Sequence, residues 1–108
     1  TSMNTRIDWE SPIDSIIGKI KGLAPKPGSW TILFNGENQI RMKILKARAV
    51  NYSKTNSKNI LLIRDKKIFI STRNGEIECD IIQLENKKAM TAKDMVNGYN
   101  FSSNCFVK

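Results

Sequence analysis

The 108-residue sequence contains no histidine. This absence excludes His-based catalytic triads and His-containing zinc sites, and it weakens any case for acid–base catalysis near neutral pH. Its two cysteines, Cys79 and Cys105, are too few for a disulfide framework. We interpret them as reduced thiols, with a single disulfide as the alternative. We therefore expect no catalytic residue and no metal site in this chain.

Long apolar runs are also missing. The longest, residues 60–63, ends at Arg64, far short of the roughly 20 residues that a membrane span requires. No charged segment followed by an apolar one marks a secretory signal. These absences predict a cytoplasmic protein with no membrane partner, or an internal fragment of one. The length suits a single domain covering residues 1–108.

Aromatic residues make up only 7% of the chain, which is low for a surface that stacks splayed bases. Trp9, Trp30 and Phe34 lie in apolar patterns and are interpreted as core residues. Tyr52, beside a basic segment, is the one aromatic considered for a sugar or base contact. This distribution favours backbone binding to folded RNA over binding to single strands.

Positive charge is abundant and unevenly placed. The net charge is +8, and residues 24–75 carry eleven lysines and arginines against only Glu37 and Asp65. Residues 1–23 are neutral, and residues 76–108 carry four basic side chains against five acidic ones. A polyanion partner explains this segregation, with nucleic acid favoured over an anionic membrane surface. The alternative is that the lysines serve only solubility.

Short strands dominate the expected secondary structure. A helix is expected to start at residues 11–14, where Ser11 and Asp14 resemble a capping box, and to end at Gly22. Apolar periodicity predicts strands over residues 30–34, 40–49, 60–63, 67–71 and 77–84, and a short helix from Thr91 to Gly98. Residues 51–59 are expected to form a flexible basic loop.

Two of the expected strands change phase. In the segment 40–49 the apolar positions are first even and then odd, which indicates a bulge or sharp bend near Leu45. The segment 77–84 slips in the same way. Curved short strands with two helices favour a mainly β fold, a small OB-like antiparallel barrel with a leading helix and a short late helix. Its core is expected to include Trp30, Ile44, Ile63 and Ile70.

The basic residues are the candidate binding site. Arg41 and Lys43 are expected on one strand face, and Lys46 and Arg48 on the other, so that only one pair can face RNA. The full candidate set for tRNA comprises Arg41, Lys43, Lys46, Arg48, Lys54, Lys58, Lys66, Lys67, Arg73, Lys87 and Lys88. Lysines suit phosphates and read no sequence.

Several segments resemble one known family in register. They are residues 7–9 (IDW), 22–31 (GLAPKPGSWT), 34–36 (FNG), 42–47 (MKILKA), 82–84 (IQL), 87–94 (KKAMTAKD) and 97–98 (NG). Together they resemble the C-terminal domain of the methionyl-tRNA formyltransferase family, from about residue 7 to residue 98. The sequence departs from that pattern at three turns. Asn59 and Asn86 replace expected glycines, and residues 72–75 form a basic rather than an acidic turn.

The resemblance implies a division of labour. In that family a separate N-terminal catalytic domain transfers a formyl group from 10-formyltetrahydrofolate to the methionine amine of initiator tRNA. The C-terminal barrel supports the tRNA through basic residues, so the resemblance implies initiator tRNA and the catalytic domain as partners. It implies no cofactor in this part of the enzyme.

Two alternatives remain at this stage. The same module is joined to other folate-linked formyltransferases whose substrates are not tRNA, and the net charge of +8 argues against them. A stand-alone OB-type domain for single-stranded nucleic acid is disfavoured by the scarcity of stacking aromatics and by the family resemblance.

Overall fold

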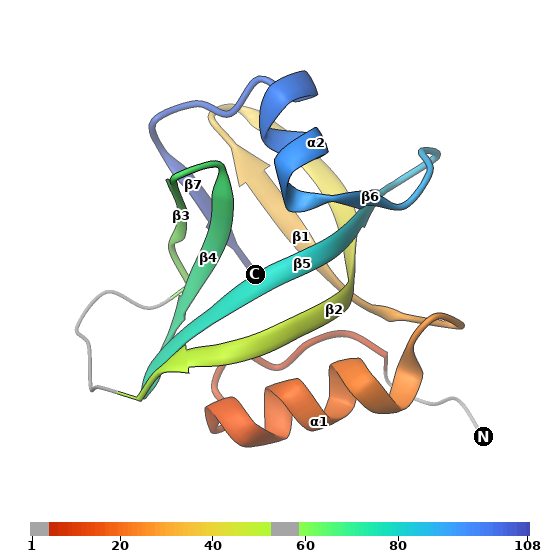
Figure 1. The fold of residues 1–108 in the computed structure, drawn as a ribbon, viewed down its shortest axis with the longest axis vertical. Coiled ribbons are helices and arrows are strands. Elements are labelled where there is room, and N and C mark those ends of the chain that lie inside the picture. Colours follow the sequence, from red (N-terminus) through yellow and green to blue (C-terminus); the bar gives the residue numbers. More distant parts are fainter. Residues whose placement is uncertain (1–4, 53–58) are drawn as a thin grey trace.

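The computed structural model describes residues 5–52 and 59–108, which form one curved antiparallel sheet and two helices (Figure 1). The strands are β1 (Ser29–Asn35), β2 (Asn38–Asn51), β3 (Leu61–Arg64), β4 (Lys67–Thr72), β5 (Gly75–Leu84), β6 (Met90–Thr91) and β7 (Cys105–Val107). They are ordered β3-β4-β5-β2-β1-β7, and β6 pairs with β5. The expected mainly β fold with a leading and a late helix is confirmed.

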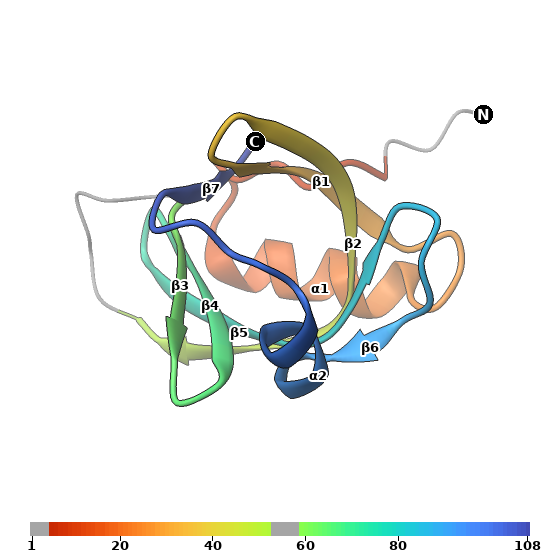
Figure 2. The same cartoon turned by 90° about the horizontal axis from the view of Figure 1, so that it is seen from above.

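The sheet curls until its two edges meet. Ile60 forms an antiparallel bridge with Phe106, and the Val107 amide donates to the Asn59 carbonyl at 2.9 Å. Seen from above, the strands enclose a ring with α1 lying across one of its ends (Figure 2). Closure of this kind leaves few unpaired strand edges.

Helix α1 (Ile13–Leu23) covers the end of the barrel with an apolar stripe. Ile13, Ile16 and Ile20 are fully buried in the same core cluster as the inward side chains of the strands. Trp9, just before the helix, is also buried, and its indole N–H donates to the Thr31 hydroxyl at 2.9 Å. The expected core role of Trp9 is therefore confirmed.

The expected capping of α1 is wrong at both ends. The helix begins at Ile13 with no cap from a neighbouring side chain; instead, the Ile13 amide donates to Asn74 Oδ1, 3.1 Å away in the β4–β5 turn. At the other end, Gly22 lies inside the helix, which ends at Leu23 before Pro25. Helix α2 (Ala92–Gly98) behaves as expected, because Thr91 Oγ1 accepts from the Asp94 amide at 3.2 Å.

The phase slips predicted in β2 and β5 are present. The β2–β5 register shifts between Ile44 and Lys46 and again before Ala47, so Met42, Ile44 and Ala47 all point inward. In β5 the buried residues change from Ile77 and Cys79 to Ile82 and Leu84. Each bulge bends its strand around the barrel.

Two of the four expected core residues are buried. Ile44 and Ile70 have no exposed surface, whereas Ile63 is 37% exposed near the end of β3. Trp30 and Phe34 are half-buried, because β1 turns Ser29, Thr31, Leu33 and Asn35 inward and its aromatics outward. Phe34 stacks there on Phe106 of β7, with ring centroids 4.7 Å apart. The core interpretation of Trp30, Phe34 and Ile63 is therefore wrong.

Neither described helix has the length and the apolar character that crossing a membrane would demand.

Candidate nucleic-acid interface

All four basic residues of β2 lie on the outer face of the barrel. Arg41 and Lys43 alternate with the buried Met42 and Ile44, and Lys46 and Arg48 flank the buried Ala47. The bulge at Leu45 adds one residue between the two pairs, which keeps both outside. The expectation that the pairs occupy opposite strand faces is wrong, because the change of parity is itself the bulge.

Acidic residues of β5 partner two of the arginines. Arg48 Nη2 lies 3.0 Å from Glu78 Oε1 and 4.0 Å from Asp80 Oδ1. The hydrogen bond to Glu78 and the nearby carboxylate charges raise the pKa of Arg48. Arg64 of β3 pairs with Glu76 at 2.7 Å and lies over the Phe69 ring. These guanidinium groups are already engaged within the protein.

A first hollow of about 380 Å³ lies beside Glu78 and Asp80. We call it the Lys46 hollow, and its charged lining consists of Lys46, Arg48, Lys66, Lys67, Lys93, Glu78 and Asp80. Four of the candidate residues thus come together, and the structure adds Lys93 from α2. The capping pattern around Thr91 predicted where α2 begins, but it did not predict that Lys93 lines this hollow.

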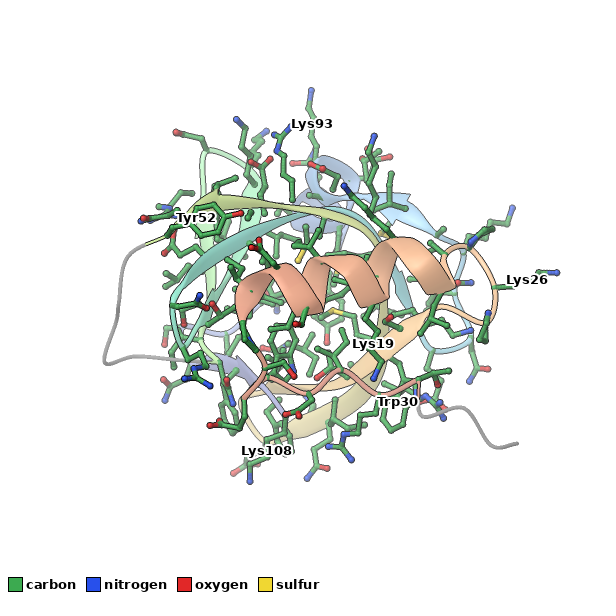
Figure 3. The ribbon with its side chains drawn as sticks, turned by 90° about the horizontal axis from the view of Figure 1, so that it is seen from below. Lys19, Lys26, Trp30, Tyr52, Lys93 and Lys108 are labelled. Carbon is green, nitrogen blue, oxygen red and sulfur yellow. The ribbon has the colours of Figure 1, made fainter. Side chains whose placement is uncertain are left out.

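A second hollow of about 360 Å³ lies between β2 and the β5–β6 turn. We call it the Arg41 hollow, and it is lined by Arg41, Lys43, Gln83, Leu84, Glu85 and Asn86. Lys87 and Lys88 follow directly in the same turn, where the Lys87 carbonyl accepts from Gln83 Nε2 at 3.0 Å. Viewed from below, Trp30 and Lys93 lie on opposite sides of α1 (Figure 3), and the two hollows share no lining residue.

The Arg41 hollow adjoins a row of side chains that crosses four segments. Arg6 bridges to Trp30, Trp30 pairs with Lys43, and Lys43 pairs with Gln83, all on the outer face. The guanidinium carbons of Arg41 and Arg6 lie 3.9 Å and 5.1 Å from the Trp30 ring centroid. Cation–π contacts of this kind hold an arginine in place. Sequence reasoning missed this role of Trp30 because it placed the indole in the core.

The remaining candidates are elsewhere. Arg73 lines neither hollow; its Nη1 donates to the Glu10 carbonyl at 3.0 Å beside the start of α1. Lys54 and Lys58, with most of the expected basic loop, lie outside the described residues. Tyr52 is 64% exposed, and its hydroxyl donates to Asp14 Oδ1 at 2.9 Å, which raises the pKa of the phenol. The phenol is thus tied to α1.

Two observations concern metal-ligating and thiol side chains in the residues that the structure describes. Over residues 5–52 and 59–108, no three His, Cys, Asp or Glu side chains are grouped to hold a metal ion. Cys79 and Cys105 are both buried and free, and burial raises the pKa of the Cys79 thiol far above its usual range. A protonated, enclosed thiol is a poor nucleophile.

The Arg48–Glu78 pair yields a stability prediction. Arg48→Ala removes the partner of a carboxylate that is only 10% exposed, so we expect the urea midpoint to fall. Replacing Glu78 by Gln in the same chain removes the unpaired charge and should recover most of the loss. Urea unfolding followed by circular dichroism measures both. Equal losses in the single and the double variant would show that the pair is not coupled.

The comparison with known proteins gives a family. The family model described as "Formyl transferase, C-terminal domain" matches residues 1–100. Methionyl-tRNA formyltransferase of Flavobacterium johnsoniae is 32% identical over 99 residues, which cover 92% of this chain and 31% of that protein. The enzyme of the same name from Parvibaculum lavamentivorans is 34% identical over 94 residues, covering 87% of this chain and 30% of that protein. The chain thus spans about a third of the length of these curated relatives.

A solved structure shares the fold. HypX from Aquifex aeolicus, in complex with tetrahydrofolic acid, superposes with a TM-score of 0.65 over 87% of this chain and 16% of its own. At 19% identity, this likeness concerns the fold alone.

Proposed function

Because the chain belongs to the formyl transferase C-terminal domain family, we propose that it is the tRNA-binding C-terminal domain of a methionyl-tRNA formyltransferase. In the whole cytoplasmic enzyme, an N-terminal catalytic domain transfers a formyl group from 10-formyltetrahydrofolate to the methionine amine of initiator tRNA. The domain described here binds no cofactor and holds the tRNA. The observation that carries this proposal is the cluster of cations around the Arg41 hollow.

Phosphate binding requires cations that are accessible and not already neutralised. Around the Arg41 hollow lie Arg41, Lys43, Lys87 and Lys88, and Glu85 is the one carboxylate among the described residues that line it. None of Arg41, Lys43, Lys87 and Lys88 is in an ion pair with a described residue. Each such cation that meets a phosphate releases a counterion from the RNA. This side of the barrel is therefore the proposed primary contact.

The Lys46 hollow is a weaker candidate for the same role. Its five cations share the space with two carboxylates, and Arg48 is held by both of them. A phosphate entering this hollow meets like charge as well as opposite charge. We therefore assign the Lys46 hollow, Lys66 and Lys67 included, a secondary contribution.

The alternative is a C-terminal module of another folate-linked formyltransferase, with a substrate other than tRNA. The fold shared with HypX is compatible with it, since one architecture serves several functions. The net charge of +8 and its concentration in the central strands favour RNA, as do the names of the sequence relatives. Family membership also argues against a stand-alone OB-type nucleic-acid-binding module.

Titration of the chain with tRNA tests the proposal. We expect dissociation constants of about 10⁻⁴ to 10⁻⁶ M at physiological salt for initiator and elongator tRNA alike, because phosphates carry little sequence information. The logarithm of the association constant should fall with the logarithm of salt concentration, by about 0.9 for each neutralised phosphate. Fluorescence anisotropy at several salt concentrations measures both quantities. Absence of binding at low salt would contradict the proposal.

A further inference from the structure

A carboxylate lies within the most basic part of the surface. Glu85 is exposed in the lining of the Arg41 hollow, and its amide donates to the Arg41 carbonyl at 2.9 Å. Within residues 5–52 and 59–108, no cation lies in ion-pair distance of its side chain. A phosphate is repelled from this position. A group that reaches Glu85 must therefore offer hydrogen-bond donors, whereas a phosphate in the same hollow is favoured beside Arg41 and Lys43.

The hollow has the size and the polar groups of a small-molecule site. Its volume of about 360 Å³ lies within the range of about 300–1,000 Å³ in which ligand pockets are found. Arg41 and Lys43 supply donors, Glu85 supplies acceptors, and Leu84 supplies apolar surface. Gln83 Nε2 is fixed by its hydrogen bond to the Lys87 carbonyl.

Arg41 also provides a flat surface next to these groups. Its guanidinium carbon lies 3.9 Å from the centroid of the Trp30 ring, so one face of the guanidinium rests on the indole. Unpaired RNA bases stack on arginine planes as they do on aromatic rings. A base entering the hollow can therefore stack on Arg41 and reach Glu85 with its edge.

We propose that the Arg41 hollow binds one unpaired guanine nucleotide of an RNA, an inference that rests on the RNA-binding function proposed above. Guanine presents two adjacent donors, N1–H and N2–H, which match the two oxygens of the Glu85 carboxylate. Its O6 and N7 acceptors suit the Lys43 ammonium, which leaves the Arg41 guanidinium to stack on the face of the base. The N3–H of uracil is flanked by two carbonyl oxygens, which a carboxylate repels. Adenine and cytosine each present one amino group beside a ring acceptor.

Short oligouridylates with one central guanosine, inosine or adenosine test this selectivity. Bidentate recognition of a base is worth about 1–3 kcal/mol of discrimination, so guanosine should bind at least about fivefold more tightly than adenosine. Inosine lacks the N2 amino group and should fall between them. Equal affinities for the three oligonucleotides would overturn the proposal.

Glu85→Gln separates base recognition from charge. The substitution removes a negative charge, so electrostatics alone predicts tighter binding of every oligonucleotide. Recognition of guanine predicts the opposite for the guanosine oligonucleotide, whose affinity should fall about fivefold or more while that for adenosine is unchanged or rises. Glu37→Gln, an equal charge change in the exposed β1–β2 turn, is the matched control and should retain the guanosine preference.

The outcomes distinguish this inference from the proposed function. If tRNA binds and Glu85→Gln strengthens all oligonucleotides equally, the guanine site is wrong and the phosphate-binding surface stands. If the chain binds tRNA but no oligonucleotide, the guanine site is again wrong. If tRNA itself does not bind, the proposed function fails together with the inference.

Discussion

Gly75→Ala is expected to destabilise the chain by about 3 kcal/mol or more, because the added Cβ would overlap rigid backbone atoms. Such an overlap costs more free energy than extra atoms usually cost in a packed core. Gly75 begins β5 with a φ of +152°, opposite the end of β2. A Cβ there would lie 1.8 Å from the Asn51 carbonyl oxygen and 2.9 Å from its carbon. Neither atom belongs to a flexible side chain, so β2 or the β4–β5 turn must move. Urea unfolding followed by circular dichroism measures the loss.

Gly18→Ala is the matched control for that substitution. Gly18 is exposed in α1, and an added Cβ meets no atom within 4 Å. Alanine in a helix interior is worth up to about 1 kcal/mol over glycine, so this variant should be more stable than the parent chain. We therefore expect Gly75→Ala to lower the free energy of unfolding and Gly18→Ala to raise it. A Gly75→Ala variant within 1 kcal/mol of the parent would mean that the end of β2 yields easily, and would contradict the close approach.

The sequence predicted the strands and their bends better than the direction of their side chains. The change of parity in residues 40–49 correctly indicated a bulge near Leu45. From the same change of parity, Arg41 and Lys43 were predicted on one face of the strand, and Lys46 and Arg48 on the other. A bulge instead returns the residues beyond it to the original face. Knowing that Ala47 is the buried residue requires the β2–β5 register, which no local pattern contains.

The sequence did not predict which face of β1 is buried, because three of its inward-facing residues are polar. Trp30 and Phe34 are larger and more apolar than Ser29 and Thr31, so composition alone turns the aromatics inward. The structure reverses this, because Thr31 Oγ1 donates to the Lys108 carbonyl and accepts from Trp9, while Ser29 Oγ donates to the Lys19 carbonyl. Buried polar groups are tolerated when hydrogen-bonded, and these partners lie 10 to 77 residues away.

The candidate site shows the same limit. Charge segregation drew attention to residues 24–75, which include β2, and the tandem pair Lys87 and Lys88 drew attention to the β5–β6 turn; both are local features of the sequence. It did not reveal that Arg48 pairs with Glu78, or that Arg73 donates to Glu10 beside α1. Nor did it reveal that Trp30 supports Arg41. Each of these depends on contacts between distant segments.

Removing Arg41 and Lys43 together should weaken tRNA binding by up to roughly 30-fold. Both lie in the Arg41 hollow, and neither is neutralised by a described carboxylate. Each exposed cation–phosphate contact contributes up to about 1 kcal/mol, and every 1.4 kcal/mol is about a tenfold change in affinity. The salt slope should also become shallower by about 2, since about 0.9 is lost with each phosphate contact.

The matched control is the double variant Lys46→Ala, Arg48→Ala. It removes one lysine and one arginine from the same strand and the same outer face, with the same change in net charge. Because Arg48 is held by Glu78 and Asp80, only the Lys46 contact is lost, and this variant should lose about fivefold or less. Urea midpoints of both doubles establish that each remains folded at the titration temperature.

Anisotropy titrations of the two double variants with one tRNA, at two salt concentrations, test most directly whether the barrel binds RNA through the Arg41 hollow. The expected result is a loss of up to roughly 30-fold and a salt slope shallower by about 2 for the Arg41 and Lys43 double, against about fivefold or less and about 0.9 for the Lys46 and Arg48 double. Equal losses in both doubles would mean that only net charge matters. Unchanged affinity in the Arg41 and Lys43 double would contradict the assigned interface.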